Sequence, residues 1–341
     1  MQGLSGAGRF DQAVGGLCAP LAKWLSAVPA SIKREATEVR LRMNRPVVVI
    51  TCRDMLFITQ DGTPTGDYEK GRTVSQKELA DSFLSLCRYS VFSKQSSIKN
   101  GFITVAGGHR AGLCGTAIVQ EGGEISGIRD ISSINLRIAR EVTGSAQALL
   151  QAFADQPGGM LLVGPPASGK TTLLRDMARQ LSLGDEKLRL QARKVAVVDE
   201  RGELAGTFGG AAQNNLGLCD ILDGYPKGIG IEQAVRSLSP DVIVCDEVGN
   251  MQEIQAIRQG LNAGTLFIAS LHAGDKAELL RRRQARTLLS TQAFQKVALL
   301  SGSGHPGNVV SMLKGADLLA EMDRLYPTNC GGGGDRLLTI A

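Results

Sequence analysis

The stretch that decides the fold is Gly164-Pro165-Pro166-Ala167-Ser168-Gly169-Lys170-Thr171, which fits the Walker A, or P-loop, pattern G-x-x-x-x-G-K-[ST]. Before it, residues 159–163 form a short apolar run that predicts a buried strand. After it, residues 172–181 place apolar side chains at helical spacing. A P-loop requires a strand, a glycine-rich loop and a helix in this order, so both flanks support the motif.

This motif predicts a site for ATP together with Mg²⁺. Backbone N–H groups of the loop and of the helix N-terminus would point at the phosphates, whose negative charge the helix dipole favours. Lys170 would reach the β- and γ-phosphates, and the Thr171 hydroxyl would ligate Mg²⁺. The predicted nucleotide-binding residues are Gly164, Pro165, Pro166, Ala167, Ser168, Gly169, Lys170, Thr171 and Thr172.

A second apolar run ends in a pair of carboxylates. Residues 241–247 read Asp-Val-Ile-Val-Cys-Asp-Glu and predict a strand with Walker B chemistry at its tip. We expect Asp246 to hold the Mg²⁺ shell and Glu247 to orient or deprotonate the attacking water.

Two more polar residues follow predicted strands of the same domain. Glu200 comes shortly after the strand predicted at 194–198 and is a second candidate for the catalytic base. His272 lies just past the strand predicted at 265–270. The carboxyl ends of parallel strands form the ligand side of such sheets, so we expect His272 to sense the γ-phosphate.

The composition is that of a globular protein with room for two domains. The chain has 341 residues, 43% of them hydrophobic and 21% charged, and its net charge of +5 gives no strong nucleic-acid signal. Its seven cysteines are scattered singly, which favours reduced thiols over a zinc site or a disulfide framework. No apolar stretch approaches the roughly 18 residues of a membrane span, so we predict no transmembrane segment.

We predict an α/β fold in which a RecA-like P-loop NTPase core follows a smaller N-terminal α+β domain. The predicted parts are an α+β domain at 1–140, a P-loop ATPase domain at 141–325 and a Gly-rich flexible tail at 326–341. In the first domain a helix is expected over residues 10–32. A second helix is expected to begin after Ser75, with Glu78 completing a capping box.

The order of the motifs resembles that of the secretion and type IV pilus traffic ATPases, which carry a Walker A motif, an acidic box, a Walker B segment and a His box. The matching segments are 164–171, 198–200, 236–247 and 263–273. A closer resemblance, to the stage III sporulation protein AA family of that superfamily, rests on residues 38–42, 101–110, 132–141 and 219–227. Two features depart from the traffic ATPases: Asp246 stands where they usually have glycine, and the acidic box lacks their usual proline.

The resemblance implies a cytoplasmic, ring-forming ATPase, a homo-oligomer and in particular a hexamer, peripheral at the inner, mother-cell membrane. It would power assembly of, or transport through, the channel between mother cell and forespore, with a membrane protein of that sporulation channel complex as partner. In such rings the N-terminal domain of one subunit closes over the nucleotide of its neighbour. Arg110 and Arg137 match the arginines that approach the γ-phosphate there, and Arg140 is an alternative.

Two other functions are compatible with a P-loop. A nucleic-acid-dependent RecA-like motor is one, although an aromatic content of 4% offers little material for base stacking. A nucleotide-binding assembly scaffold with negligible turnover is the other. Four intact residues argue against it: Lys170, Thr171, Asp246 and Glu247. The basic cluster formed by residues 281–283 and Arg286 is interpreted as a solvated helix face or a subunit contact.

Overall fold

The computed structural model describes residues 5–99, 101–123, 125–140, 142–302 and 304–326. The chain forms two compact units, the first made of residues 1–143 and 201–216 and the second of residues 144–200 and 217–341. The chain therefore passes between the units not only near residue 143 but also on both sides of the segment 201–216. All but the first residue of the tail predicted at 326–341 lie outside the described residues.

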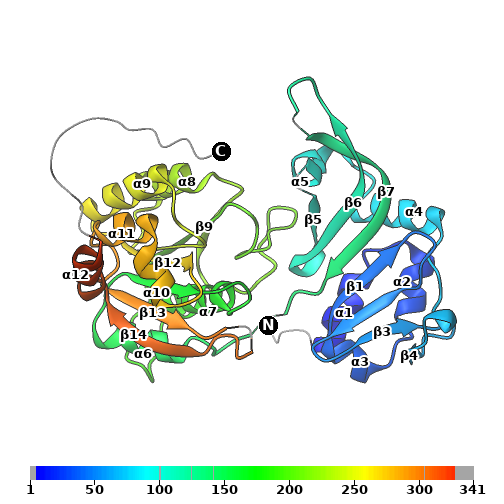
Figure 1. Ribbon diagram of the computed structural model, residues 1–341, viewed down its shortest axis with the longest axis horizontal. Helices are drawn as coiled ribbons and strands as arrows, with labels where there is room; N and C mark the ends of the chain where they lie inside the picture. Colours follow the sequence, from blue (N-terminus) through cyan, green and yellow to red (C-terminus); the bar gives the residue numbers. More distant parts are fainter. Residues whose placement is uncertain (1–4, 100, 124, 141, 303, 327–341) are drawn as a thin grey trace. The chain divides into compact units, whose positions relative to one another are not determined.

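Unit 2 contains a seven-stranded sheet in the order β10-β9-β11-β12-β8-β13-β14 (Figure 1). Its strands are β8 (Met160–Gly164), β9 (Val195–Asp199), β10 (Asp220–Asp223), β11 (Val242–Cys245), β12 (Leu266–His272), β13 (Lys296–Leu300) and β14 (Val309–Lys314). Its helices are α6 (Gln147–Asp155), α7 (Lys170–Leu183), α8 (Lys227–Leu238), α9 (Met251–Asn262), α10 (Lys276–Arg281), α11 (Arg283–Leu289) and α12 (Gly315–Leu325). All neighbouring strands pair in parallel except β14, which is antiparallel to β13.

The central strands of unit 2 are apolar along their whole length because both faces of the sheet are covered. Every residue of β8, β9 and β11 is buried. Alternate residues such as Leu161, Ala196 and Ile243 share one core with α8 and α9, and α7 covers the other face (Figure 1). This is the predicted RecA-like α/β core, and its parallel register brings the carboxyl ends of the strands to one edge.

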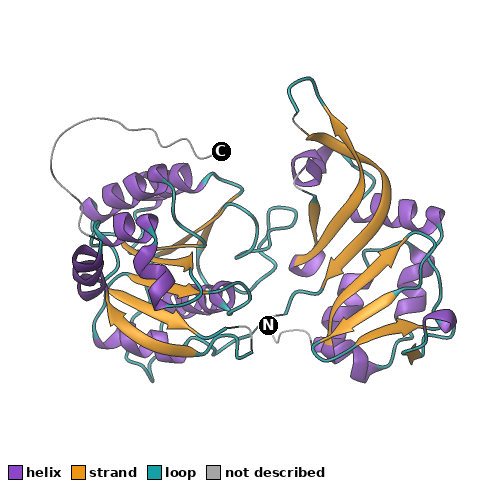
Figure 2. Ribbon diagram, in the orientation of Figure 1, coloured by secondary structure: helices purple, strands orange, loops and turns teal. Residues whose placement is uncertain are grey.

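Unit 1 contains a second, antiparallel sheet, whose strands are drawn in orange in Figure 2. The strand order is β4-β3-β2-β1-β7-β6-β5. Its strands are β1 (Ala36–Arg42), β2 (Val48–Thr51), β3 (Met55–Ile58), β4 (Pro64–Thr65), β5 (Phe102–Val105), β6 (His109–Val119) and β7 (Ile125–Arg137). Its helices are α1 (Gly6–Val14), α2 (Ala19–Leu25), α3 (Ala30–Glu35), α4 (Gln76–Leu86) and α5 (Gln95–Lys99), with 3₁₀ turns η1 (Tyr68–Lys70), η2 (Phe92–Lys94) and η3 (Ala106–Gly108). The helices α1, α2 and α4 share a hydrophobic core with the sheet.

The single helix predicted over residues 10–32 is wrong, because the structure forms three short helices there. Helix α1 ends at Val14, before Gly15 and Gly16, whose high conformational freedom disfavours a helix interior. Pro20 lies in the first turn of α2, and Pro29 is the N-cap of α3, two positions where a missing N–H costs nothing.

The capping box predicted at the start of the next helix is confirmed. The Ser75 side chain accepts a hydrogen bond from the Glu78 backbone N–H, and the Glu78 carboxylate accepts one from the Ser75 backbone N–H. Both contacts satisfy donors that the first turn of α4 would leave unpaired.

The segment 201–216 belongs to unit 1 because it is bound to the turn that joins β5 and β6. The Gly107 N–H donates to Oε1 of Gln213 at 2.9 Å, and Arg110 Nη1 lies 3.0 Å from Oε1 of Glu203. The predicted boundary between residues 140 and 141 did not place residues 201–216 with the first domain. That the two predicted domains fold independently stays a prediction. Among the described residues, no helix is both long and apolar enough to cross a membrane.

Candidate nucleotide-binding site

The predicted P-loop connects the end of β8 to the start of α7. Gly169 has a φ of +90°, and a Cβ atom at this position would lie 2.6 Å from the Gly307 nitrogen. The Gly307 N–H also donates to the Ser168 carbonyl at 2.8 Å, so the loop between β13 and β14 supports the P-loop backbone. Only glycine meets both the conformation and the space at residue 169.

The Lys170 ammonium is held inside this loop. The side chain is 5% exposed and donates to the carbonyl oxygens of Gly164 and Pro165, both at 2.8 Å. Burial lowers the pKa of Lys170, while the charges of Asp246 and Glu247 act in the opposite direction. A desolvated ammonium whose donors point into a glycine-rich loop is suited to neutralise phosphate charge.

Thr171 of the Walker A motif and Asp246 of the Walker B strand are in contact, as expected for two residues that would bind the same Mg²⁺. The Thr171 hydroxyl donates to Oδ2 of Asp246 at 2.7 Å, although the residues are 75 positions apart. The other carboxylate oxygen, Oδ1, accepts from the Ser270 hydroxyl, and the Ser270 oxygen accepts from the Glu247 N–H at 3.0 Å. Ser270 is fully buried on β12, and the sequence signal for it was a polar residue after the apolar run of residues 266–269.

His272 lies between the P-loop lysine and the Walker B glutamate. In the sheet register it pairs with Gly164, the first residue of the P-loop. Its Nδ1 lies 3.1 Å from Lys170 Nζ, and since an ammonium only donates, Nδ1 accepts. Its Nε2 is 3.9 Å from Oε1 of Glu247, which is too long for a hydrogen bond.

Glu200 connects to this group through a residue that the sequence analysis missed. The Lys227 ammonium lies 3.7 Å from Oε2 of Glu200 and donates to the Glu247 carbonyl. The segment around Lys227 contributed to the family resemblance, but nothing in the pattern said which carboxylates the lysine would contact.

The donor set is compatible with Mg²⁺ bound beside a nucleotide. Among the described residues there is no group of three or more His, Cys, Asp or Glu side chains that could hold a metal alone. The Thr171 hydroxyl and the Asp246 carboxylate instead supply two adjacent oxygens. Mg²⁺ is typically held by one or two protein oxygens, with phosphate oxygens and water completing its shell.

The candidate arginines belong to unit 1. Arg110 and Arg137 are directly opposite each other in the β6–β7 ladder. Arg110 pairs with Glu203 at 3.0 Å and lies 3.5 Å from the centre of the Phe102 ring. The Arg137 side chain is 64% exposed, and its Nε lies 3.5 Å from Oε1 of Glu38.

Arg140 differs from these two arginines because its guanidinium forms hydrogen bonds with the backbone of unit 1. It donates to the carbonyl oxygens of Arg34 and Ala36 at 2.5 and 2.8 Å. These bonds tie the segment after β7 to the end of α3 and the start of β1, which favours a structural role for Arg140 over the role of an arginine finger.

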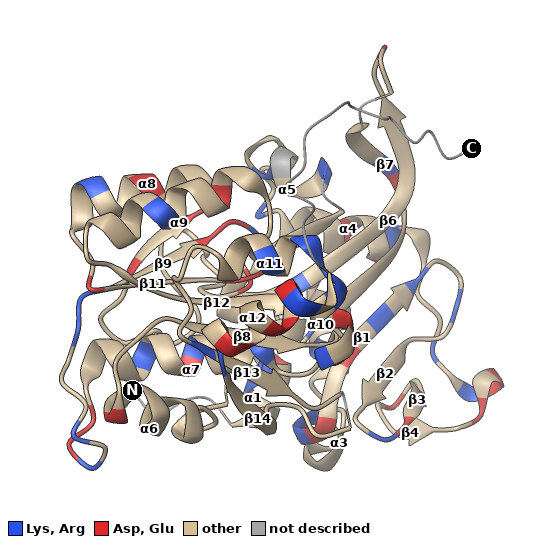
Figure 3. Cartoon of the chain, turned by 60° about the vertical axis from the view of Figure 1, so that its left-hand side comes forward, with Lys and Arg blue, Asp and Glu red and all other residues tan. Residues whose placement is uncertain are grey.

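Two arginines of the basic cluster after the His box form salt bridges within unit 2. Arg282 forms a salt bridge with Glu278 at 2.5 Å, and Arg286 pairs with Asp323 of α12. In the view of Figure 3, basic and acidic residues are interspersed on the helices of this unit. Exposed pairs of this kind are typical of a solvated surface.

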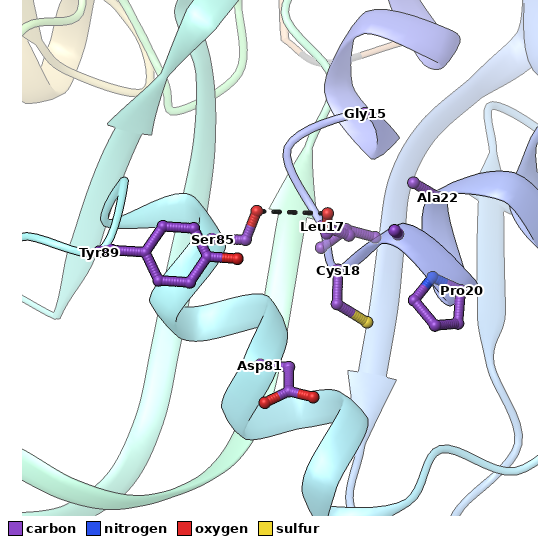
Figure 4. A pocket seen from close by; sticks show the side chains of 9 residues that line it. Gly15, Leu17, Cys18, Pro20, Ala22, Asp81, Ser85 and Tyr89 are labelled. Carbon is purple, nitrogen blue, oxygen red and sulfur yellow. Dashed lines mark hydrogen bonds between the residues drawn. The ribbon is translucent and has the colours of Figure 1, made fainter.

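A separate open pocket of about 690 Å³ lies in unit 1 between the α1–α2 connection and α4 (Figure 4). The Ser85 hydroxyl donates to the Leu17 carbonyl at 3.3 Å across it. None of the predicted site residues lines this pocket.

The parallel sheet and the motifs that converge at its carboxyl edge define a protein with a RecA-like P-loop core. The pilus retraction motor PilT in its ADP-bound crystal structure superimposes with a TM-score of 0.55 at 13% identity, covering 85% of this chain and 84% of that one. The Yersinia pseudotuberculosis ATPase DotB gives a TM-score of 0.51 at 14% identity, with 85% and 82% covered. At these identities the likeness concerns the fold alone.

The chain belongs to the family described as sporulation stage III, protein AA, whose model matches residues 13–317. The stage III sporulation protein AA of Bacillus subtilis (strain 168) is 38% identical over 288 residues, covering 84% of this chain and 89% of that protein. The predicted family resemblance is therefore confirmed.

Proposed function

We propose that the chain hydrolyses ATP to ADP and phosphate at the P-loop of unit 2. The observation that carries this proposal is the convergence of Lys170, Thr171, Asp246, Glu247 and His272 at the carboxyl edge of one parallel sheet. These side chains come from three strand ends, and in open α/β sheets ligands bind at this edge.

Each residue has a role that its contacts support. Lys170 neutralises charge on the phosphates. Thr171 and Asp246 would hold Mg²⁺, which would polarise the phosphoryl oxygens when bound. Glu247 orients a water molecule and accepts its proton, which then passes to solvent. His272 contacts Lys170 and faces Glu247, so it is placed to respond to the γ-phosphate.

We further propose that the protein works as a homo-oligomeric ring, and in particular a hexamer, at the cytoplasmic face of the mother-cell membrane. The ring would power assembly of, or transport through, the sporulation channel, with a membrane protein of that complex as its partner. Membership of the sporulation family and a fold shared with secretion and pilus ATPases support this role.

The test is phosphate release by the purified full-length chain with Mg²⁺ and ATP, measured over a range of protein concentrations. We expect turnover per subunit to rise as oligomers form. Assembly with ATP but no phosphate release would instead indicate a scaffold. Stimulation that depends on single-stranded DNA or RNA would indicate a nucleic-acid motor.

A further inference from the structure

The structure contains a buried lysine that links the two candidate bases of the site. Lys227 is the first residue of α8 and is 8% exposed. Its ammonium donates to the backbone carbonyl of Glu247 and lies 3.7 Å from both Oε2 of Glu200 and Oε1 of Glu253. These partners come from the ends of β9 and β11 and from the first turn of α9.

The position of this ammonium is closely determined by its surroundings. A buried charge is costly unless it is paired and hydrogen-bonded, and Lys227 meets two carboxylates and one carbonyl. Glu253 is 4% exposed and is itself fixed, because it accepts from the Gly249 N–H at 2.7 Å and from the Asn250 amide at 2.8 Å. Glu253 therefore gives the Lys227 ammonium a fixed carboxylate partner.

The contact with Glu247 matters because the backbone of Glu247 is in an unusual conformation. Its φ is +47°, in the left-handed region that residues with a side chain avoid. The Lys227 ammonium binds the carbonyl of this residue, and the Ser270 hydroxyl binds its N–H. With both backbone groups held, the Glu247 carboxylate lies 3.9 Å from the His272 ring.

We propose that Lys227 is a positioning residue that holds Glu247 in its left-handed conformation and thereby aims the carboxylate of Glu247 at the attacking water. This inference rests on the proposed ATP hydrolysis. It also separates the two candidate bases. The Glu247 carboxylate lies 3.9 Å from the His272 ring, which itself binds Lys170, whereas Glu200 is paired with Lys227 and acts through it.

The test compares Lys227→Met with Lys227→Arg and with the surface control Lys187→Met in the full-length protein. We expect Lys227→Met to lower kcat for phosphate release by ~10- to 100-fold, in line with misplacing a group at a reacting centre. The KM for ATP and the affinity for a non-hydrolysable ATP analogue should stay close to those of the unaltered protein. Lys227→Arg should recover part of kcat because it keeps the charge and donors, and Lys187→Met should match the unaltered protein.

A double variant guards against a folding defect. Lys227→Met leaves the buried Glu253 carboxylate without its cation, so Lys227→Met with Glu253→Gln removes both charges while Gln can still serve in the capping box. This double variant should also lose kcat with KM unchanged. Combining Lys227→Met with Glu200→Gln should be no slower than Lys227→Met alone, because Glu200 acts through Lys227.

The failures of the two proposals are distinguishable. An unaltered kcat in a folded Lys227→Met protein, or in the double variant with Glu253→Gln, would overturn the role of Lys227 while leaving ATP hydrolysis intact. A loss confined to ATP affinity or to the melting temperature would do the same. Absence of turnover in the unaltered protein would overturn ATP hydrolysis and this inference together.

Discussion

The hydroxyl of Thr171 donates to Oδ2 of Asp246 at 2.7 Å, joining the end of the P-loop to the tip of the Walker B strand. The contact exists because β8 and β11 are parallel strands of one sheet, so that the residues after each strand lie at the same edge. The same edge holds His272, whose strand lies between β8 and β11. Every proposed step of hydrolysis in unit 2 depends on this alignment.

Glu247→Gln is expected to separate nucleotide binding from chemistry. The amide keeps the shape of the side chain but cannot accept a proton, so hydrolysis should slow by at least ~100-fold while ATP binding is retained. The measurement is single-turnover phosphate release alongside analogue binding. Glu200→Gln serves as the matched comparison and should retain more activity. The reverse order, with Glu200→Gln inactive and Glu247→Gln active, would assign the base to the acidic box.

Arg137 is expected to act in trans if the site is completed by a neighbouring subunit. Arginine fingers contribute ~10³-fold or more to rate, so Arg137→Ala should be nearly inactive alone. Mixing it with the inactive Lys170→Ala protein should restore partial activity, because some interfaces then pair an intact P-loop with an intact arginine. Arg110→Ala deserves the same mixing experiment, since Arg110 is the cross-strand partner of Arg137. If the subunits are shown to mix and activity is not restored, neither arginine acts on the nucleotide of a neighbouring subunit.

The stability of unit 1 is expected to fall in mild acid because of His109. This side chain is fully buried, its Nδ1 accepts from the Ala139 N–H at 2.9 Å, and burial together with the charge of Arg9 lowers its pKa to about 4. Because the pKa of His109 is lower in the folded state than in the unfolded state, the unfolded chain takes up the proton first as the pH falls. The stability is therefore fully present above pH 6.5 and is lost as the pH falls toward 4. From the shift, the loss between pH 8 and pH 5 is about 2 kcal/mol.

The free energy of unfolding in urea, measured across this range, tests that expectation. His109 Nε2 also lies 3.3 Å from Oε1 of Gln12. His109→Gln therefore offers a comparison, because its amide can accept from Ala139 and donate to Gln12 without titrating. Its stability should depend less on pH between 6.5 and 4. Identical pH profiles for the two proteins would show that another group is responsible.

The P-loop core could be predicted from sequence because its signals are local. An apolar run, a glycine-rich loop and helical spacing sit side by side around residue 164, and the paired carboxylates at 246 and 247 directly follow their strand. The structure brings together residues that each motif had placed separately, as with Lys170 and His272, 102 positions apart and 3.1 Å from one another.

What could not be predicted depends on contacts between distant segments. The helix predicted over residues 10–32 is an exception, because its error was local: the apolar periodicity continues through Gly15, Gly16, Pro20 and Pro29, and these residues divide the segment into three short helices. The attachment of residues 201–216 to unit 1 rests on single contacts such as Gly107 with Gln213. The role of Lys227 could not be predicted because no local motif contains it. Its partners follow β9 and β11 or lie in the first turn of α9, and only the fold brings them together.

The most direct measurement of the central claim is steady-state phosphate release by the unaltered protein, by Lys170→Ala and by the surface control Lys187→Ala. Removing the Lys170 ammonium takes away the charge that neutralises the phosphates, so turnover should fall to background and ATP binding should weaken. Lys187→Ala should match the unaltered protein, and all three should share one melting temperature within error. Hydrolysis by folded Lys170→Ala at the unaltered rate would contradict the assignment of the P-loop as the site of ATP hydrolysis.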